Sequence, residues 1–309
     1  MASPRRVLSP APRGTFAPTG IAHPLRTTVD SLMQYVSRIP AGAPLVGAIE
    51  ILFFFDGYAP DHDRERIVPD GRMTLVIELD GRPRYVFDNE TGEALQTCRH
   101  SWLSGVHERY ITIGETRPVN RLMAVQFAPG ASVPFTGRPA SEFRNAVVTG
   151  DSVFGSSILE LRETIVSRDD PEARLDLLES WLVDRFDAEL APPAHLARAI
   201  ERLVASPSDA RITRLAAEHA GVSSRHFIEL FRRHVGTTPK VFQRVLRFSR
   251  VFEALQRSEP VSWAELSTEL GYADQSHLHH EFRLFSGYRP GEFRNRGHDR
   301  VNFFAEEGD

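Results

Sequence analysis

The side chains best suited to chemistry lie on two short stretches of helical pattern toward the carboxyl-terminal end. Each stretch has one apolar face and one face of hydrogen-bonding groups. The polar faces carry Arg225, Glu229, Arg232 and Arg233 in the first stretch and Gln275, Ser276, His277, His280 and Arg283 in the second. Guanidinium groups suit recognition of phosphates and base edges, although Arg-rich helix faces are also common as ordinary solvated surface.

Metal binding is the competing chemistry for the second stretch, which holds His277, His279 and His280. Imidazoles on a surface helix are more often solvated or engaged in polar contacts, so we expect no metal site and no cofactor. Cys98 is the only cysteine. This excludes an intramolecular disulfide framework and a Cys-rich zinc site, and a lone cysteine is more often an inert buried residue than a redox sensor.

The two stretches belong to an internal repeat. Phe231, Gly236, Pro239 and Phe242 recur 51 positions later as Phe282, Gly287, Pro290 and Phe293. Each copy reads as a short helix that ends at a glycine, a tight turn and a longer helix. This order of elements predicts two helix-turn-helix units.

The elements of the repeat follow from caps and apolar periodicity. In the first copy we expect helices over 212–220 and 225–234, with a turn at Gly221 and Ser223 or Ser224 as N-cap. In the second copy we expect helices over 264–270 and 275–285, with a turn at Gly271 and Asp274 as N-cap. One long helix over 239–257 should join the copies.

This half of the chain resembles the DNA-binding domain of the AraC/XylS family of transcription regulators, over about 100 residues. The resemblance is carried by Ala217-Glu218-His219-Ala220-Gly221-Val222-Ser223, Gly236-Thr237-Thr238-Pro239, Leu270-Gly271-Tyr272-Ala273-Asp274-Gln275-Ser276-His277 and Gly287-Tyr288-Arg289-Pro290. It implies that the second helices of both units enter successive major-groove segments on one face of double-stranded DNA, about 34 Å apart.

The resemblance also implies roles for individual side chains. Base contacts fall on Arg225, Ile228 and Glu229 in the first unit and on Gln275, Ser276, His277 and His280 in the second. Arg225 suits a guanine edge and Glu229 suits cytosine N4, whereas Ile228 reads a thymine methyl or only packs. Phosphate contacts, which position without specifying, are expected from Arg232, Arg233, Lys240, Arg244, Arg247 and Arg283.

The sequence pattern between residues 45 and 135 is typical of β structure. Apolar runs at 49–55, 73–79, 84–87, 109–113 and 122–127 are separated by turn pairs such as Asp70-Gly71 and Asp80-Gly81. This spacing predicts a small sandwich or barrel, and many members of the resembled family place a cupin-like barrel there. An apolar effector pocket would be lined by Phe53, Phe55, Tyr58, Trp102 and Phe127, although core packing explains these residues equally well.

Two other classes of function remain open for this half. A metal-dependent cupin enzyme with a helical appendage would draw on His62, His100 and His107, but the chain lacks a His-x-His pair followed by Glu. We therefore expect no enzyme. A module that only oligomerises and binds no ligand is the other alternative, and helices expected over 157–167 and 171–186 would form a dimer seam or cap the barrel.

The fold class expected is thus α+β, with an amino-terminal cupin-like β-barrel and accessory helices before an all-α pair of helix-turn-helix units. We expect an arm at 1–24, a sensor or assembly domain at 25–186, a Pro-rich linker at 187–194, the DNA-binding domain at 195–296 and a tail at 297–309. At 309 residues, two domains are the natural expectation.

The charge divides in the same way. The whole chain has 37 Lys and Arg against 41 Asp and Glu, but residues 196–296 carry 16 against 11. We therefore expect a basic half that reads DNA and an acidic half that regulates this DNA binding. No membrane-length apolar run or secretory signal stands out, so we expect a cytoplasmic protein. The expected partners are DNA, a small-molecule effector, a second copy of the chain and, for an activator, RNA polymerase.

Overall fold

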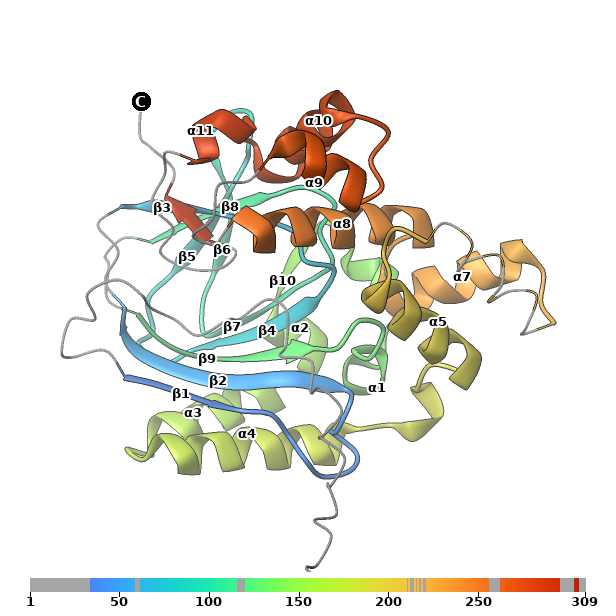
Figure 1. The fold of residues 1–309 in the computed structure, drawn as a ribbon. Coiled ribbons are helices and arrows are strands. Elements are labelled where there is room, and N and C mark those ends of the chain that lie inside the picture. Colours follow the sequence, from blue (N-terminus) through green and yellow to red (C-terminus); the bar gives the residue numbers. More distant parts are fainter. Residues whose placement is uncertain are drawn as a thin grey trace, which may run out of the picture.

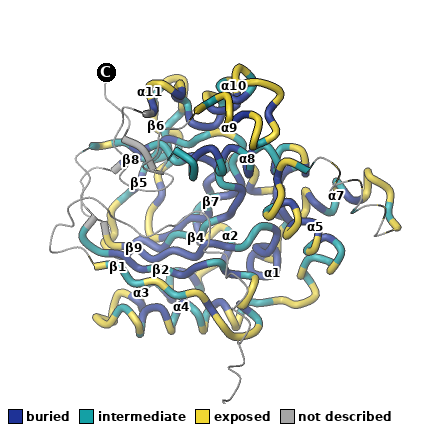
Figure 2. Tube along the Cα trace, viewed as in Figure 1, coloured by how far each residue is buried: buried dark blue, intermediate teal, exposed yellow. Residues whose placement is uncertain are grey.

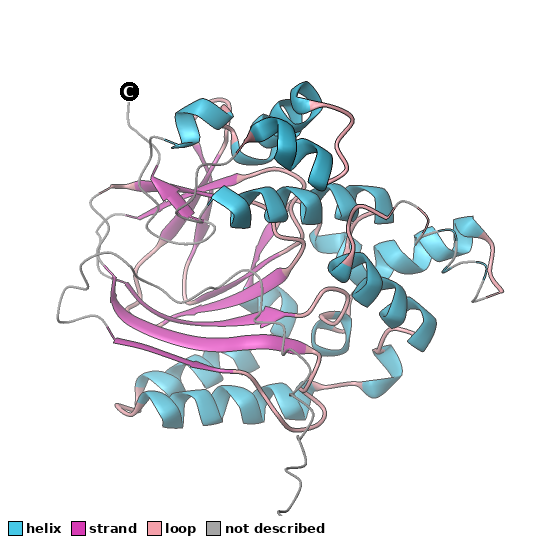
Figure 3. Cartoon of the chain, viewed as in Figure 1, coloured by secondary structure: helices cyan, strands magenta, loops and turns pink. Residues whose placement is uncertain are grey.

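The computed structural model describes residues 34–58, 62–115, 120–209, 211, 214, 216, 218, 221–255, 262–294 and 303–305. Strands dominate the amino-terminal half and helices the carboxyl-terminal half (Figure 1, Figure 3). The expected α+β class is confirmed. The expected arm at 1–24 lies outside the described residues, as does the tail at 297–309 apart from a short strand.

The larger sheet has six strands in the order β1-β2-β9-β4-β7-β10, and every neighbouring pair is antiparallel. The strands are β1 (Gln34–Arg38), β2 (Ile49–Tyr58), β9 (Asn120–Phe127), β4 (Met73–Glu78), β7 (Ser101–Ser104) and β10 (Val147–Thr149). The apolar runs predicted at 49–55, 73–79 and 122–127 form its three central strands, where burial on both faces is greatest.

The smaller sheet has five antiparallel strands in the order β11-β3-β8-β5-β6. The strands are β11 (Phe303–Ala305), β3 (Arg64–Ile67), β8 (Ile111–Glu115), β5 (Arg84–Phe87) and β6 (Ala94–Cys98). Within the described part of the chain, no strand pairing joins this sheet to the larger one. The two sheets therefore face each other as layers, and the strands of one do not continue the ladder of the other.

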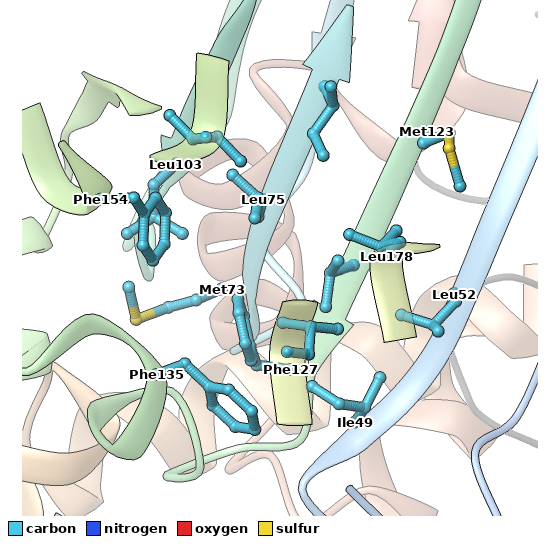
Figure 4. Packing of buried hydrophobic residues seen from close by; sticks show 14 of the residues in the cluster. Ile49, Leu52, Met73, Leu75, Leu103, Met123, Phe127, Phe135, Phe154 and Leu178 are labelled. Carbon is cyan, nitrogen blue, oxygen red and sulfur yellow. The ribbon is translucent and has the colours of Figure 1, made fainter. Parts of the chain in front are cut away.

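Two helices, α3 (Ser157–Val166) and α4 (Pro171–Arg185), cover one face of the larger sheet (Figure 1). Asp170 starts α4 by accepting hydrogen bonds from the amides of Glu172 and Ala173. The apolar side chains of both helices then meet those of β2, β4 and β9 in one cluster, part of which Figure 4 shows around Phe127 and Leu178. These helices cover the sheet, which is one of the two roles expected for them, while a dimer seam on their outer faces stays a prediction.

Short elements connect these layers. They are α1 (Val133–Thr136), η1 (Ala140–Phe143), α2 (Gly150–Phe154) and η2 (Ala188–Leu190). The η2 turn occupies the segment that the sequence predicts as a linker, and α5 (Ala194–Ala205) begins directly after its two prolines. Buried residues lie in the strands of the amino-terminal half and in the helices of the carboxyl-terminal half, as Figure 2 shows.

The carboxyl-terminal helices end close to their predicted limits. They are α7 (Ser224–Val235), α8 (Pro239–Leu255), α9 (Trp263–Glu269), α10 (Gln275–Ser286) and α11 (Pro290–Arg294). The helix expected over 212–220 falls mostly outside the described residues. No helix in the described ranges is long and apolar enough to span a bilayer.

The helical half docks against the sheets. A Cβ on Gly71 would lie 2.7 Å from the Phe242 ring of α8, and a Cβ on Gly130 would lie 2.6 Å from Ile200 of α5. These glycines therefore permit a close approach that a side chain would block. Val68, which follows β3, is 3% exposed and packs in the same cluster as Phe282 and Phe285 of α10.

Candidate nucleic-acid interface

The first helix-turn-helix unit ends in α7, and its turn has the expected caps. Gly221 has φ +63°, a conformation that glycine adopts without strain, and the Ser223 side chain accepts a hydrogen bond from the amide of His226. Phe227 and Phe231 are fully buried, while Arg225 points outward. The local sequence therefore fixes which face of α7 meets the core and which face meets solvent.

The second unit repeats this arrangement with α9 and α10. Gly271 has φ +71° at the turn, and the Asp274 side chain accepts from the amide of His277 at 2.7 Å. Leu278 and Phe282 are buried against α8. The predicted N-cap and inward face of this helix are both confirmed.

The long helix α8 lies between the two units and carries part of both cores. The Phe242 ring lies 5.6 Å from Phe231 of the first unit. The Phe248 ring lies 5.6 Å from Phe282 and 5.1 Å from Phe285 of the second unit. Aromatic contacts of this kind contribute about 0.5–1.5 kcal/mol each beyond the burial of their area, so α8 contributes to the core of each unit.

The outer face of α7 presents the base-reading side chains that the resemblance implies. Arg225 is 89% exposed and Glu229 is 56% exposed, and Nε of the first lies 3.1 Å from a carboxylate oxygen of the second. Ile228 is half-buried. An exposed ion pair of this kind contributes well under about 1 kcal/mol, so both groups are readily available to another partner.

On α10 the predicted residues divide into two groups. Gln275, Ser276 and His280 are exposed, whereas His277 turns toward the protein. Its ring meets Tyr272 edge-on at 5.4 Å, and its Nε2 lies 3.5 Å from Glu281. The structure thus places three predicted base contacts on the outer face and gives His277 partners inside the unit.

The predicted phosphate contacts also divide. Four are exposed around the two helices, namely Arg232, Arg233, Lys240 and Arg283. Arg244 and Arg247 instead lie on the side of α8 that faces α10. Arg244 Nε lies 2.5 Å from Glu281, and Arg247 donates to the backbone oxygen of Gly271 at 3.0 Å while stacking over the Tyr272 ring at 4.7 Å.

Glu281 is a feature that the sequence analysis missed. It is 2% exposed, lies between Arg244 and Arg247, and raises the pKa of the Tyr272 hydroxyl together with burial, which is the larger cause. Its repeat equivalent is Leu230, an apolar residue. A charge at an apolar position of a repeat is the signal that would have revealed this cluster.

The amino-terminal half divides the predicted effector residues between two faces of the larger sheet. Phe53, Phe55 and Trp102 belong to two clusters that share Val76, on the side toward the smaller sheet. Phe127 lies on the helix-covered side, 5.3 Å from the Phe135 ring, so it cannot line one pocket with the other three. The side chain of Tyr58 is outside the described part of the structure.

A buried ion pair lies in the layer between the sheets. Glu78 is fully buried, and its carboxylate lies 3.0 Å from Arg84 Nε, whose guanidinium is 6.0 Å from the Trp102 ring. Burial raises the pKa of Glu78 to about 7. Cys98, in the same layer, has its thiol pKa raised to about 11 by burial, which makes it unreactive at neutral pH.

The histidines of the cupin alternative have separate partners. His62 Nε2 lies 3.2 Å from Glu65, and His107 Nε2 lies 3.0 Å from the Ser104 hydroxyl, while His100 is exposed. Among the residues that the structure describes, no three His, Cys, Asp or Glu side chains converge as metal ligands would.

Comparison with known proteins shows which families the two parts of the chain match. Residues 216–296 match a family described as a helix-turn-helix domain, and residues 37–149 match a domain of unknown function, DUF6597. The carboxyl-terminal part is therefore a helix-turn-helix domain. Two units joined by one long helix are the arrangement that the resemblance to the AraC/XylS family implies, and that resemblance is confirmed.

A curated relative covers the same part of the chain. The HTH-type transcriptional regulator GlxA of Rhizobium meliloti (strain 1021) is 33% identical over 109 residues, which are 35% of this chain and 31% of GlxA. The matched segment thus spans less than a third of that relative.

Two solved structures are reported for comparison. ToxT from Vibrio cholerae O395 bound to (E)-4-(8-methylnaphthalen-1-yl)but-3-enoic acid has a TM-score of 0.44 at 8% identity, covering 85% of this chain and 98% of ToxT. The AraC-like transcriptional activator CuxR has a TM-score of 0.23 at 10% identity, covering 71% of this chain and 86% of CuxR.

Proposed function

We propose that the protein is a sequence-specific DNA-binding transcription regulator of AraC type. The observation that carries the proposal is the equivalent exposure of the outer faces of α7 and α10, with Arg225 and Glu229 on one and Gln275, Ser276 and His280 on the other. Each face presents donors and acceptors that suit base edges in the major groove. Catalysis is no part of this function.

The amino-terminal half supports regulation in this proposal. A small effector would bind in the layer between the sheets, where Phe53, Phe55 and Trp102 share a face with the buried Glu78 and Arg84 pair. A second copy of the chain, a cytoplasmic location and, for an activator, contact with RNA polymerase complete the proposal. A thermal-shift screen of small molecules tests the effector, and the absence of any stabiliser would leave dimerisation as the role of this half.

Selection of bound sequences from random double-stranded DNA by the full chain tests the DNA-binding function. We expect one enriched site with two conserved segments whose centres lie about one helical turn apart. Binding to that site should weaken steeply with salt. An enriched pool without a shared sequence, at any salt concentration, would overturn the proposal.

A further inference from the structure

One loop of the amino-terminal half touches both helix-turn-helix units. This loop, residues 105–110, joins β7 to β8. Val106 lies against Gly236, Glu108 accepts a hydrogen bond from the Thr237 hydroxyl at 2.5 Å, and the Tyr110 ring lies against Gly287. A segment of only six residues thus reaches the ends of both α7 and α10.

The two places that the loop touches are equivalent in the repeat. Gly236 ends α7 and Gly287 ends α10, 51 positions later, and both are left-handed caps, with φ +94° and +75°. A Cβ at Gly287 would lie 2.6 Å from Tyr110, and one at Gly236 would lie 3.1 Å from the Ala140 backbone oxygen. Both caps therefore combine a conformation suited to glycine with a close approach from the amino-terminal half.

The contact with the second unit includes a stacked cation. The Arg66 guanidinium of β3 lies 4.9 Å from the Tyr110 ring centre and 4.4 Å from that of Tyr288, which directly follows Gly287. Cation–π contacts of this kind stabilise the packing of the rings, and more so where water is excluded. The three side chains thus tie the end of α10 to the sheet.

The loop itself is held in place by its own half of the chain. The Glu108 amide donates to the Asn145 side chain at 2.7 Å, and the Asn145 amide donates to the Val106 carbonyl at 3.0 Å. At the other end, the Asn89 side chain donates to the Tyr110 carbonyl at 2.8 Å. Because both ends of the loop are anchored to the amino-terminal half, movement of either unit relative to the sheets would have to break the loop's contacts with Thr237 or Gly287.

We propose that the 105–110 loop sets the relative placement of the two recognition helices, with Glu108 and Tyr110 as positioning residues. The inference rests on the proposed function, because the placement of α7 relative to α10 determines which spacing of DNA segments both helices can enter together. Neither residue contacts DNA in this scheme. Each acts through the residue that it contacts at a helix end, Thr237 for Glu108 and Gly287 for Tyr110.

A distance measurement tests the positioning without DNA. Nitroxide labels on Arg232→Cys and Arg283→Cys, which replace equivalent exposed residues of α7 and α10, report the separation by double electron–electron resonance. Cys98 is buried, with a thiol pKa of about 11, so it should remain unlabelled, and a chain without the added cysteines checks this. We expect one narrow distance distribution, which should broaden about twofold or more when Glu108→Ala and Tyr110→Ala are combined.

Matched variants keep this test decisive. Tyr110→Phe keeps the ring that touches Gly287 and should retain the narrow distribution. If the double alanine variant fails to fold, Thr237→Val removes the hydroxyl that donates to Glu108 from the opposite side and should broaden the distribution. An unchanged distribution in the folded double alanine variant, or in Thr237→Val where the double variant does not fold, would overturn the proposal.

The second arm of the experiment uses the selected DNA site. One base pair inserted between its two segments should weaken wild-type binding roughly tenfold or more, whereas the Glu108→Ala and Tyr110→Ala chain should lose less than about threefold. The base preference within each segment should not change. A wild-type chain that selects no DNA sequence would contradict the proposed function, while the distance measurement would still decide the positioning role.

Discussion

Glu281 of α10 and Arg244 of α8 form an ion pair of 2.5 Å in which the carboxylate is 2% exposed. Arg247 lies 3.6 Å from the same carboxylate group. Two arginines that the sequence assigns to the DNA surface therefore also fix the second recognition helix on the linking helix. Their phosphate contacts stay a prediction, whereas their contact with Glu281 is a property of the fold.

Removal of the Glu281 carboxylate should destabilise the protein. Glu281→Ala leaves Arg244 and Arg247 without their shared partner, and breaking a buried ion pair costs about 3–5 kcal/mol. Glu142→Ala removes one partner of an exposed pair with Arg138, whose side chains are 44% and 45% exposed, and it should cost less than about 1 kcal/mol. Urea unfolding measures both, and equal losses for the two variants would contradict a structural role for Glu281.

Lys240 should behave as a phosphate contact. It is exposed at the start of α8, so Lys240→Ala should leave the free energy of unfolding nearly unchanged. Binding to all sequences should weaken by a similar factor, and the slope of log K against log salt should fall by about one. Arg168→Ala, at an exposed position after α3, is the matched control and should bind as the wild type does. A Lys240→Ala chain with the wild-type salt slope would exclude this contact.

His107 should make stability depend on pH. Burial lowers the pKa of its imidazole from 6.5 to about 4 in the folded chain. Between about pH 6.5 and 4 the unfolded chain therefore binds a proton that the folded chain does not, so the free energy of unfolding should fall as the pH falls. His107→Gln should lose this part of the dependence when unfolding is measured across the range. Parallel curves for the two chains would show that His107 titrates normally.

Phe127 should act in the core and not in effector binding. Phe127 is fully buried on the helix-covered face of the sheet, so Phe127→Ala should lower the free energy of unfolding, measured in urea, by about 3–5 kcal/mol. Phe53→Ala, on the opposite face where the side chain is half-buried, should cost less. A small molecule that stabilises the wild-type chain in the thermal-shift screen should still stabilise Phe127→Ala but should no longer stabilise Phe53→Ala.

The helical half was predictable because its signals are local. Gly236 and Gly287 end their helices at an offset of 51, and Ser223 and Asp274 cap α7 and α10 at the same offset. Glu281 was hidden because a charge in a helical pattern reads as surface, and only its partners on α8 reveal that it is buried. Pairwise placement of this kind is set by tertiary packing, which periodicity does not encode.

The sheets were predictable only in part. The apolar central strands follow from their runs, but β1, β3 and β6 alternate polar and apolar residues weakly, and the partners of β3 lie far away in sequence. The face on which Phe127 lies depends on its register with Ile49 of β2. Register is fixed by the whole sheet, and a shift of one residue reverses every side chain.

The reading of two DNA segments by two helices is tested most directly by repeating the selection from random DNA with Arg225→Ala and with His280→Ala. We expect Arg225→Ala to lose preference at about one base pair in one segment, and His280→Ala to lose it only in the other, each at a cost of about 1–3 kcal/mol on the wild-type site. Selected sites that match the wild-type site in both variants, or that change in the same segment, would contradict this assignment of the two helices.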